Sequence, residues 1–404
     1  MIPTQSTDDD GDRSSWRNGL LLALLIWLLA GMLYRQSPQA AIGDGELRGA
    51  LDASRLIKSH QSEYAGNYVT TPLPAVALRP LARMPETIVA QLWRATCVLS
   101  LLVAIGLFAK AAQLKLHEAA PLGILLIVGF YFPPTQLDFS QAQLQTPVLA
   151  LLCAAYLADS QGRAYRLATC IALAALIKLW LLALLVYLLF RRRVLPFFWG
   201  LLLFAGAMAG LLARVGWREI WSLLDAAKRH QGLDLAFDYR NQSLLGFARV
   251  HFGPNSAAQP VLDNPILLNG VVAVGFFVIL AGLKYAFRIE RSAEPEKRRL
   301  CLGLTIVSLL LACPICRPAS FVLLLPTVWT LLACDGVPGL ARTAGAAAYV
   351  LLTCSVATSN HPAGLESLAP SSFFFGASVL WLALMGAIAH RQKRQADELD
   401  TLWD

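Results

Sequence analysis

Long apolar runs recur along this chain, and they constrain its fold more than any other feature. A helix that crosses a bilayer needs about 20 mostly apolar residues, and only 15% of the residues here are charged, against about 25% in a soluble domain. Apolar and polar residues do not alternate within the runs, as they would in a transmembrane β-barrel. The sequence therefore predicts an all-α polytopic membrane protein.

The predicted spans form a single transmembrane domain, residues 19–390. An acid-rich segment, residues 1–18, is predicted to be a disordered cytoplasmic tail, and residues 391–404 are predicted to be a C-terminal cytoplasmic tail. The expected apolar spans are Gly19–Tyr34, which we expect to be retained, Ile88–Ala109, Ala120–Phe132, Leu144–Ala158, Leu167–Phe190, Leu195–Leu212, Ile266–Phe287, Leu300–Ala312, Phe321–Ala333, Ala346–Ala357 and Phe373–Ile388.

The distribution of Lys and Arg predicts the topology, because short basic loops stay in the cytoplasm. Strict alternation of spans satisfies this rule everywhere except at Leu167–Phe190, which lies between two basic loops. Two short helices broken near Lys178 restore the pattern. The result is about twelve segments, both termini in the cytoplasm, and two large outside loops, residues 35–87 and 214–265. We expect a multi-pass protein of a bacterial inner membrane.

Asp44 is the first candidate functional residue, because it follows the first apolar run and opens a polar loop. Such a carboxylate can act as a base beside the membrane, or it can simply cap a helix, as Asp often does. Residues 44–59 look helical, with an imperfect apolar stripe. Glu46 and Asp52 are rival bases in the same stretch.

Four basic residues on the outside face are candidates for holding a phosphate. Lys178 interrupts an apolar run, where a charge costs about 2.5–3.5 kcal/mol; the alternative is a side chain that snorkels to the interface. Arg240 and Arg249 lie in the second outside loop and match the geometry of phosphate contacts, or they are simply solvated. Arg317 follows the break Cys313–Cys316 and binds either a phosphate or a nearby carboxylate.

Four amide side chains are candidates for binding sugar hydroxyls. Gln143 and Gln145 precede an apolar run, and Asn241 and Gln242 lie in the second outside loop; the alternatives are helix caps and headgroup contacts. No metal-ligand or nucleotide-binding motif is found, so we expect no metal and no cofactor. The net charge of +8 comes largely from residues flanking the spans, and we expect no nucleic-acid partner.

The order of these motifs resembles that of glycosyltransferase family 87. Gly43-Asp44 matches its opening motif, Tyr68 with Pro72-Leu73 its return to the membrane, and Ile177-Lys178 its lysine inside an apolar run. The motif Asn241-Gln242-Ser243-Leu244 with a trailing Arg249 is the closest match. Cys313-Pro314-Ile315-Cys316-Arg317 departs from the family pattern, which has Trp at the position of Arg317 and usually His where Ala319-Ser320 stand.

The resemblance implies a GT-C type fold with loop helices outside the cytoplasm. It also implies transfer of mannose, arabinofuranose or a related sugar from a polyprenyl-phosphate donor to a glycolipid or glycan acceptor. Asp44 would be the base of an inverting transfer, Lys178 with Arg240, Arg249 or Arg317 would hold the lipid phosphate, and the amides would orient the sugar. A transporter or lipid flippase, or an inactive scaffold, are the alternatives.

Overall fold

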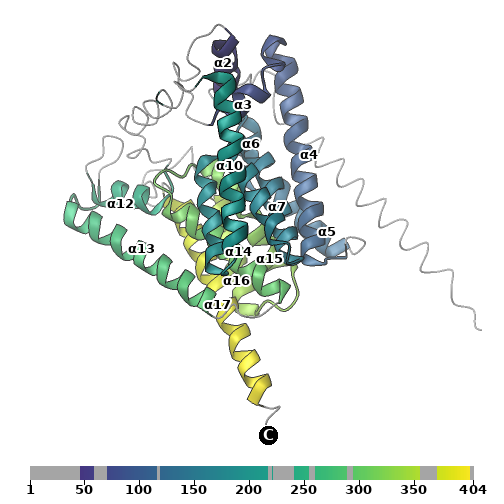
Figure 1. Ribbon diagram of the computed structural model, residues 1–404. Coiled ribbons are helices and arrows are strands. Elements are labelled where there is room, and N and C mark those ends of the chain that lie inside the picture. The colour runs from purple at the N-terminus through teal and green to yellow at the C-terminus, as the bar shows by residue number, and fades with distance from the viewer. Residues whose placement is uncertain are drawn as a thin grey trace, which may run out of the picture.

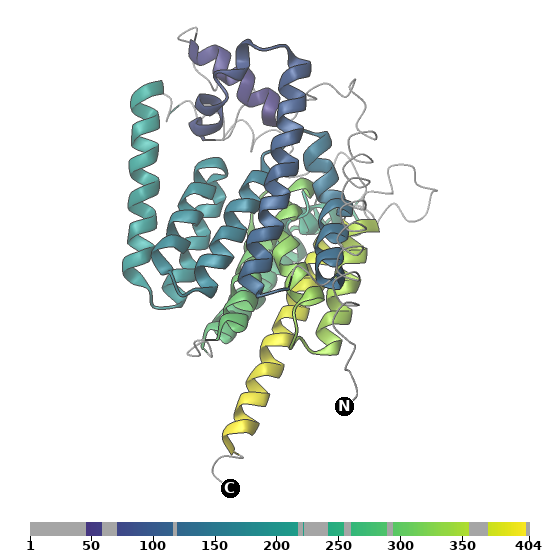
Figure 2. The same cartoon turned by 90° about the vertical axis from the view of Figure 1, so that its right-hand side faces the viewer.

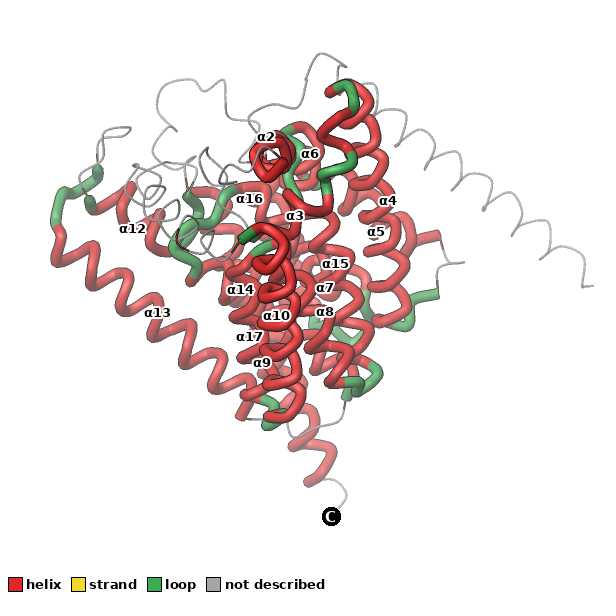
Figure 3. The backbone as a smooth tube through the Cα atoms, turned by 45° about the horizontal axis from the view of Figure 1, so that its top comes forward, coloured by secondary structure: helices red, strands yellow, loops and turns green. Residues whose placement is uncertain are grey.

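The computed structural model describes residues 46–58, 71–115, 119–216, 221, 241–253, 260–288, 294–354 and 371–400. Every secondary-structure element in these ranges is a helix (Figure 3), which confirms the predicted all-α class. The predicted first span, Gly19–Tyr34, and the acidic tail before it lie outside the described residues.

Four helices of the described part are long and apolar enough to cross a membrane. A bent pair adds a fifth if it counts as one span, with α5 (Ala119–Tyr131) and α6 (Pro133–Ser140) meeting at 50°. The predicted total of about twelve is therefore not confirmed. The four are α4 (Glu86–Ala112), α10 (Val194–Val215), α13 (Pro265–Arg288) and α17 (Ser372–Asp400), which runs on past its membrane-length portion.

The predicted break in the run 167–190 is confirmed. Helix α8 (Ala164–Ile177) ends at Lys178, whose backbone is extended, and the chain returns through η2 (Leu179–Leu185) and α9 (Val186–Phe190). The turns before α8 and after α9 line one cavity. The segment is therefore a helical hairpin, which starts and finishes at the same end of the molecule and carries Lys178 at its tip.

At two other places a helix ends at a short turn and the chain continues in a new helix. The chain turns between α6 and α7 (Gln145–Ser160), and it breaks again between α14 (Pro295–Ala312) and η3 (Pro318–Leu324), which continues into α15 (Leu325–Ala333). Proline begins α6 and η3, where its missing N–H leaves no intrahelical bond unmade. The remaining helices are α2 (Glu46–Lys58), α3 (Pro72–Ala77), η1 (Leu81–Arg83), α12 (Leu244–Phe252) and α16 (Gly339–Cys354).

Basic residues gather at the end of the bundle away from the Lys178 tip, which we call the basic end. Arg191 pairs with the buried Asp159, which also accepts a hydrogen bond of 2.6 Å from the Tyr187 hydroxyl. The Arg298 guanidinium donates to the Asp159 carbonyl at 3.1 Å. These contacts tie α7, α9 and α14 together at the foot of the hairpin.

Helices α2 and α3 cover the opposite end. They lie at the top of Figure 1 and again in the view turned by 90° (Figure 2), whereas the C-terminal part of α17 extends below the bundle. The Ser54 hydroxyl donates to the Ala75 carbonyl at 2.9 Å and joins the two short helices. The Thr71 hydroxyl donates to the Leu176 carbonyl and fixes α3 on the end of α8.

Candidate functional site

Lys178 is held at the tip of its hairpin with only 7% of its surface exposed. Its ammonium group forms an ion pair with the Glu46 carboxylate at the start of α2. A lysine buried this deeply needs a partner, because desolvation of an isolated charge is costly. The pair therefore explains how the chain tolerates a cation between two apolar helices.

Glu46 links this hairpin to the turn between α6 and α7. Its carboxylate accepts a hydrogen bond of 3.0 Å from the Leu144 N–H. With its amide nitrogen turned toward Glu46, the Gln143 side chain donates to the two oxygens of the Glu46 carboxylate at 2.9 and 3.2 Å. The Leu47 N–H also donates to the Ala142 carbonyl at 3.0 Å. Sequence reasoning treated Glu46 only as a rival base, whereas the structure makes it the partner of Lys178.

Asp138, which the sequence analysis did not single out, shapes the same turn. Its fully buried carboxylate accepts hydrogen bonds from the N–H groups of Gln145 at 3.0 Å and Thr146 at 2.9 Å, and another from the Thr146 hydroxyl. These bonds satisfy N–H groups that the first turn of a helix leaves unpaired. Its stretch lies between two predicted spans and is mostly polar, so nothing in the local sequence marked it.

We expect Asp138→Ala to destabilise the protein, because it leaves buried donors at the start of α7 unsatisfied. Each such loss costs about 1–3 kcal/mol. Thermal unfolding in detergent, followed by the loss of soluble protein, measures the effect. Asp52→Ala is the matched control, since Asp52 is exposed and, among the described residues, pairs with the neighbouring Arg55 at 2.8 Å. Equal melting of the two variants would contradict the capping role.

Gln145 connects this turn to the third break. Its amide nitrogen donates to the Ser320 hydroxyl at 3.4 Å, and its buried Oε1 has no hydrogen-bond partner among the described residues. The Ser320 N–H in turn donates to the Arg317 carbonyl at 2.9 Å. An unmet buried acceptor is uncommon in proteins, and it leaves Gln145 able to receive a hydrogen bond from a ligand hydroxyl.

Asn241 and its neighbours fasten α12 to that break. The Asn241 amide donates to the Pro314 carbonyl at 2.9 Å, and its oxygen accepts from the Cys316 N–H at 2.9 Å. The Gln242 N–H donates to the Cys316 carbonyl at 2.7 Å. The Ser243 hydroxyl accepts from the Gly246 N–H at 3.0 Å and caps the helix, as Ser commonly does. The visible bonds of Asn241 are thus structural.

The remaining predicted site residues lie in different settings. Arg317 is exposed beside the break, and its guanidinium has no partner among the residues that the structure describes. Arg249 is half-buried on α12. Asp44 and Arg240 lie outside the described residues, so their positions rest on the sequence alone. Of the rival bases, Glu46 lies in the cluster and Asp52 faces away from it.

His251, near the end of α12, gives this region a pH-dependent contact. Its ring Nε2 lies 3.0 Å from the Ser371 hydroxyl, and burial lowers its pKa below the ordinary 6.5. The unfolded chain therefore takes up a proton more readily. The stabilising contribution is full above pH 6.5 and is lost as the pH falls through the lowered pKa.

We expect acidification from pH 7.5 to 5.5 to lower the melting temperature of the wild type more than that of His251→Gln. Thermal unfolding at both pH values measures the difference. The Gln variant keeps a hydrogen-bonding side chain of similar length and removes the titration. Parallel losses in the two proteins would show that other groups cause the pH effect.

Together, the start of α2 and the breaks bring one buried lysine, the carboxylates of Glu46 and Asp138, and several amides onto connected turns at one end of the helical bundle. Ionisable side chains among apolar helices commonly mark a functional site. A model of glycosyltransferase family 87 matches residues 68–314, more than half of the chain. The chain therefore belongs to glycosyltransferase family 87, a family of membrane glycosyltransferases. A search of curated proteins found no match.

The matched region covers much of the site but not all of it. Lys178 and the amides from Gln143 to Gln242 lie inside the match, and so do Arg240 and Arg249. Asp44 and Glu46 precede its first residue, and Arg317 follows its last one. The expected base and most of the departing motif therefore lie outside the family match.

Proposed function

We propose that this protein transfers a sugar from a polyprenyl-phosphate donor to a glycolipid or glycan acceptor at the extracytoplasmic face of a bacterial inner membrane. Family membership supports the reaction class. The buried Lys178 at a hairpin tip is the observation that supports the choice of donor, because a phosphate that takes the place of Glu46 would meet a cation there. The sugar is mannose or arabinofuranose-like.

In this proposal the donor phosphate displaces Glu46 as the partner of Lys178. An ammonium group binds phosphate as a point charge, and it stabilises the charge that develops on the departing lipid phosphate. The exposed Arg317 and the half-buried Arg249 can supply further contacts, together with Arg240. The leaving group is already a phosphate on a lipid, so the reaction needs neither a nucleotide nor a metal.

Asp44 is the proposed general base. It stands two residues before Glu46, so chain geometry keeps their Cα atoms within about 7 Å. Since Glu46 contacts Lys178, a carboxylate at Asp44 has the reach to meet an acceptor hydroxyl near the donor. The hydroxyl attacks the anomeric carbon from the face opposite the phosphate, which inverts the configuration. Gln143, Gln145, Asn241 and Gln242 are the proposed sugar-binding residues, and the unmet Oε1 of Gln145 supports this role best.

Purified protein in nanodiscs tests the proposal. We expect product from one of polyprenyl-phosphate mannose, arabinofuranose or glucose with a mixed glycolipid acceptor pool, detected by mass spectrometry. Nucleotide sugars serve as control donors and should give no product. The anomeric configuration of the product, measured by NMR, tests inversion. Absence of transfer from every lipid donor by a folded protein would favour an inactive scaffold or a transporter.

A further inference from the structure

A cavity at the basic end has no part in the proposed transfer. It has a volume of about 630 Å³ and lies between the turn before α8 and the turn before α10. Both turns are tight, with Gly162 at φ 71° and Arg192 at φ 56°. The contacts of Arg191 and Arg298 with Asp159 hold the two turns together from the inside. The cavity thus lies at the hairpin base, beside these contacts.

Four arginines give this cavity its charge. Arg163, Arg166, Arg192 and Arg193 all line it, all are exposed, and no acidic residue lines it with them. None of the four guanidinium groups has a hydrogen bond or an ion pair with another residue of the described chain. Arg191, the first residue of the run 191–193, is by contrast paired with the buried Asp159. The surplus positive charge therefore faces outward, where an anionic partner can reach it.

The surroundings of the cavity favour a lipid over a soluble anion. Leu195, Phe198 and Trp199 on α10 expose 72%, 58% and 43% of their surface, and Tyr165 on α8 exposes 51%. The rings of Tyr165 and Trp199 pack edge to face with their centroids 6.4 Å apart. Aromatic side chains of this kind collect at membrane–water interfaces. An apolar, aromatic surface thus continues from the cavity along α8 and α10.

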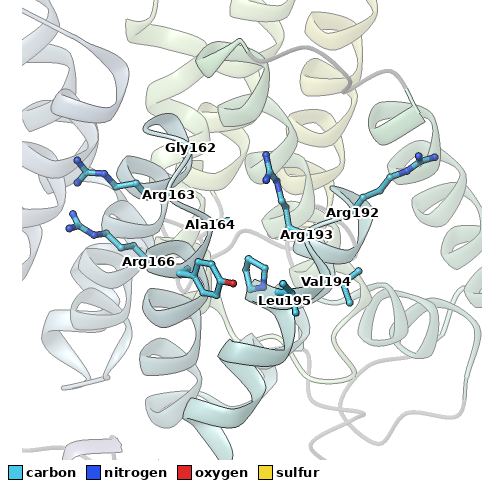
Figure 4. Close-up of a pocket in the computed structure, with 10 residues that line it drawn as sticks. Gly162, Arg163, Ala164, Arg166, Arg192, Arg193, Val194 and Leu195 are labelled. Carbon is cyan, nitrogen blue, oxygen red and sulfur yellow. The ribbon is translucent and has the colours of Figure 1, made fainter.

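The directions of the arginine side chains also favour a lipid over a small soluble anion. In Figure 4, Arg163 and Arg166 extend to one side of the cavity, while Arg192 and Arg193 extend from the other turn, and the four side chains fan outward. They do not converge on one point, as they would around a small enclosed anion. Guanidinium groups spread around an apolar floor suit headgroup phosphates at the rim, with acyl chains below them.

We propose that these four arginines bind the headgroup of an anionic phospholipid at the rim of the cavity, with the acyl chains of the lipid along α8 and α10. The lipid would brace the foot of the hairpin whose tip carries Lys178. The inference does not depend on which sugar is transferred. The alternative is that these arginines only set the membrane orientation, as basic loops do; in that case they would not distinguish one lipid headgroup from another.

Native mass spectrometry of the full chain in detergent tests the proposal with phosphatidylglycerol and phosphatidylcholine of equal chain length. We expect selective retention of phosphatidylglycerol. The double variants Arg163→Gln/Arg166→Gln and Arg192→Gln/Arg193→Gln should each weaken its apparent affinity about 30-fold, at roughly fivefold per arginine near the membrane surface. Arg79→Gln/Arg83→Gln removes the same charge from exposed positions beside α3, far from the cavity, and should leave retention unchanged.

Three results would overturn the proposal. Equal retention of the two lipids would mean that the headgroup charge is not recognised. Equal loss in the α3 control variant would mean that net charge alone attracts the lipid. Thermal stabilisation by inorganic phosphate as large as that by phosphatidylglycerol would make the cavity a site for soluble anions. Unchanged melting temperatures of the variants in lipid-free detergent show that each has folded.

Discussion

Asp44→Asn lowers the rate of sugar transfer by about 100- to 10,000-fold, the range that general-base catalysis supplies. The variant keeps the size of the side chain but can no longer take the proton from the hydroxyl of the acceptor. Donor affinity should change little, because the proposed phosphate contacts lie on other residues. Initial rates at saturating donor and acceptor measure the effect, with product detected by mass spectrometry.

Glu46→Gln is the informative comparison, because Glu46 stands two residues away and also carries a carboxylate. If Asp44 is the base, Glu46→Gln should mainly weaken the anchoring of Lys178 and leave most of the rate. Asp52→Asn, on the exposed face of α2, should be silent. A loss in Glu46→Gln as deep as that expected for Asp44→Asn, with Asp44→Asn active, would move the base to Glu46.

Lys178→Met should reduce transfer by about 100- to 1,000-fold, the loss typical of removing one electrostatic stabiliser from an active site. It should also destabilise the protein, since breaking a buried ion pair costs about 3–5 kcal/mol. The Glu46 side chain retains 22% exposure, so the lower part of that range is expected. Transfer rates and chemical unfolding in detergent measure the two effects separately.

The double variant Glu46→Gln/Lys178→Met separates stability from chemistry. It removes both charges, so most of the lost stability should return, while transfer should stay low because the phosphate contact is still absent. Arg55→Met breaks the exposed pair on α2, and exposed pairs contribute about 0.2–1 kcal/mol, so it controls for the loss of any ion pair. Full transfer by Lys178→Met would exclude Lys178 as a phosphate ligand.

The sequence predicts much of the helical framework because hydrophobic length is a local property. The runs near α4, α7, α10 and α13 match the observed helices within a few residues. The break at Lys178 was also predictable. Basic loops flank the run 167–190 on both sides, and loops of this kind stay on one side of the membrane, so the run between them must turn back. The number of full spans was not predictable, because a short apolar helix has the same sequence pattern whether it crosses the membrane or forms one arm of a hairpin.

The candidate site was less predictable, because its contacts join residues far apart in the chain. Lys178 and Glu46 are 132 residues apart, and Gln145 and Ser320 are 175 apart. Sequence patterns mark each residue as unusual but do not state its partner. Asp138 was missed for a related reason: its partners, Gln145 and Thr146, were assigned to the following helix, and a cap lying seven residues upstream has no simple spacing rule.

The hairpin of α8, η2 and α9 has a consequence for how such a protein can change over time. Because both of its feet stand at one end, the hairpin contributes no net crossing of the bundle. A segment of this kind can lengthen, shorten or be lost without inverting any helix that follows it. The position of Lys178 at the tip of the hairpin can thus be adjusted independently of the orientation of α10 and of all later spans.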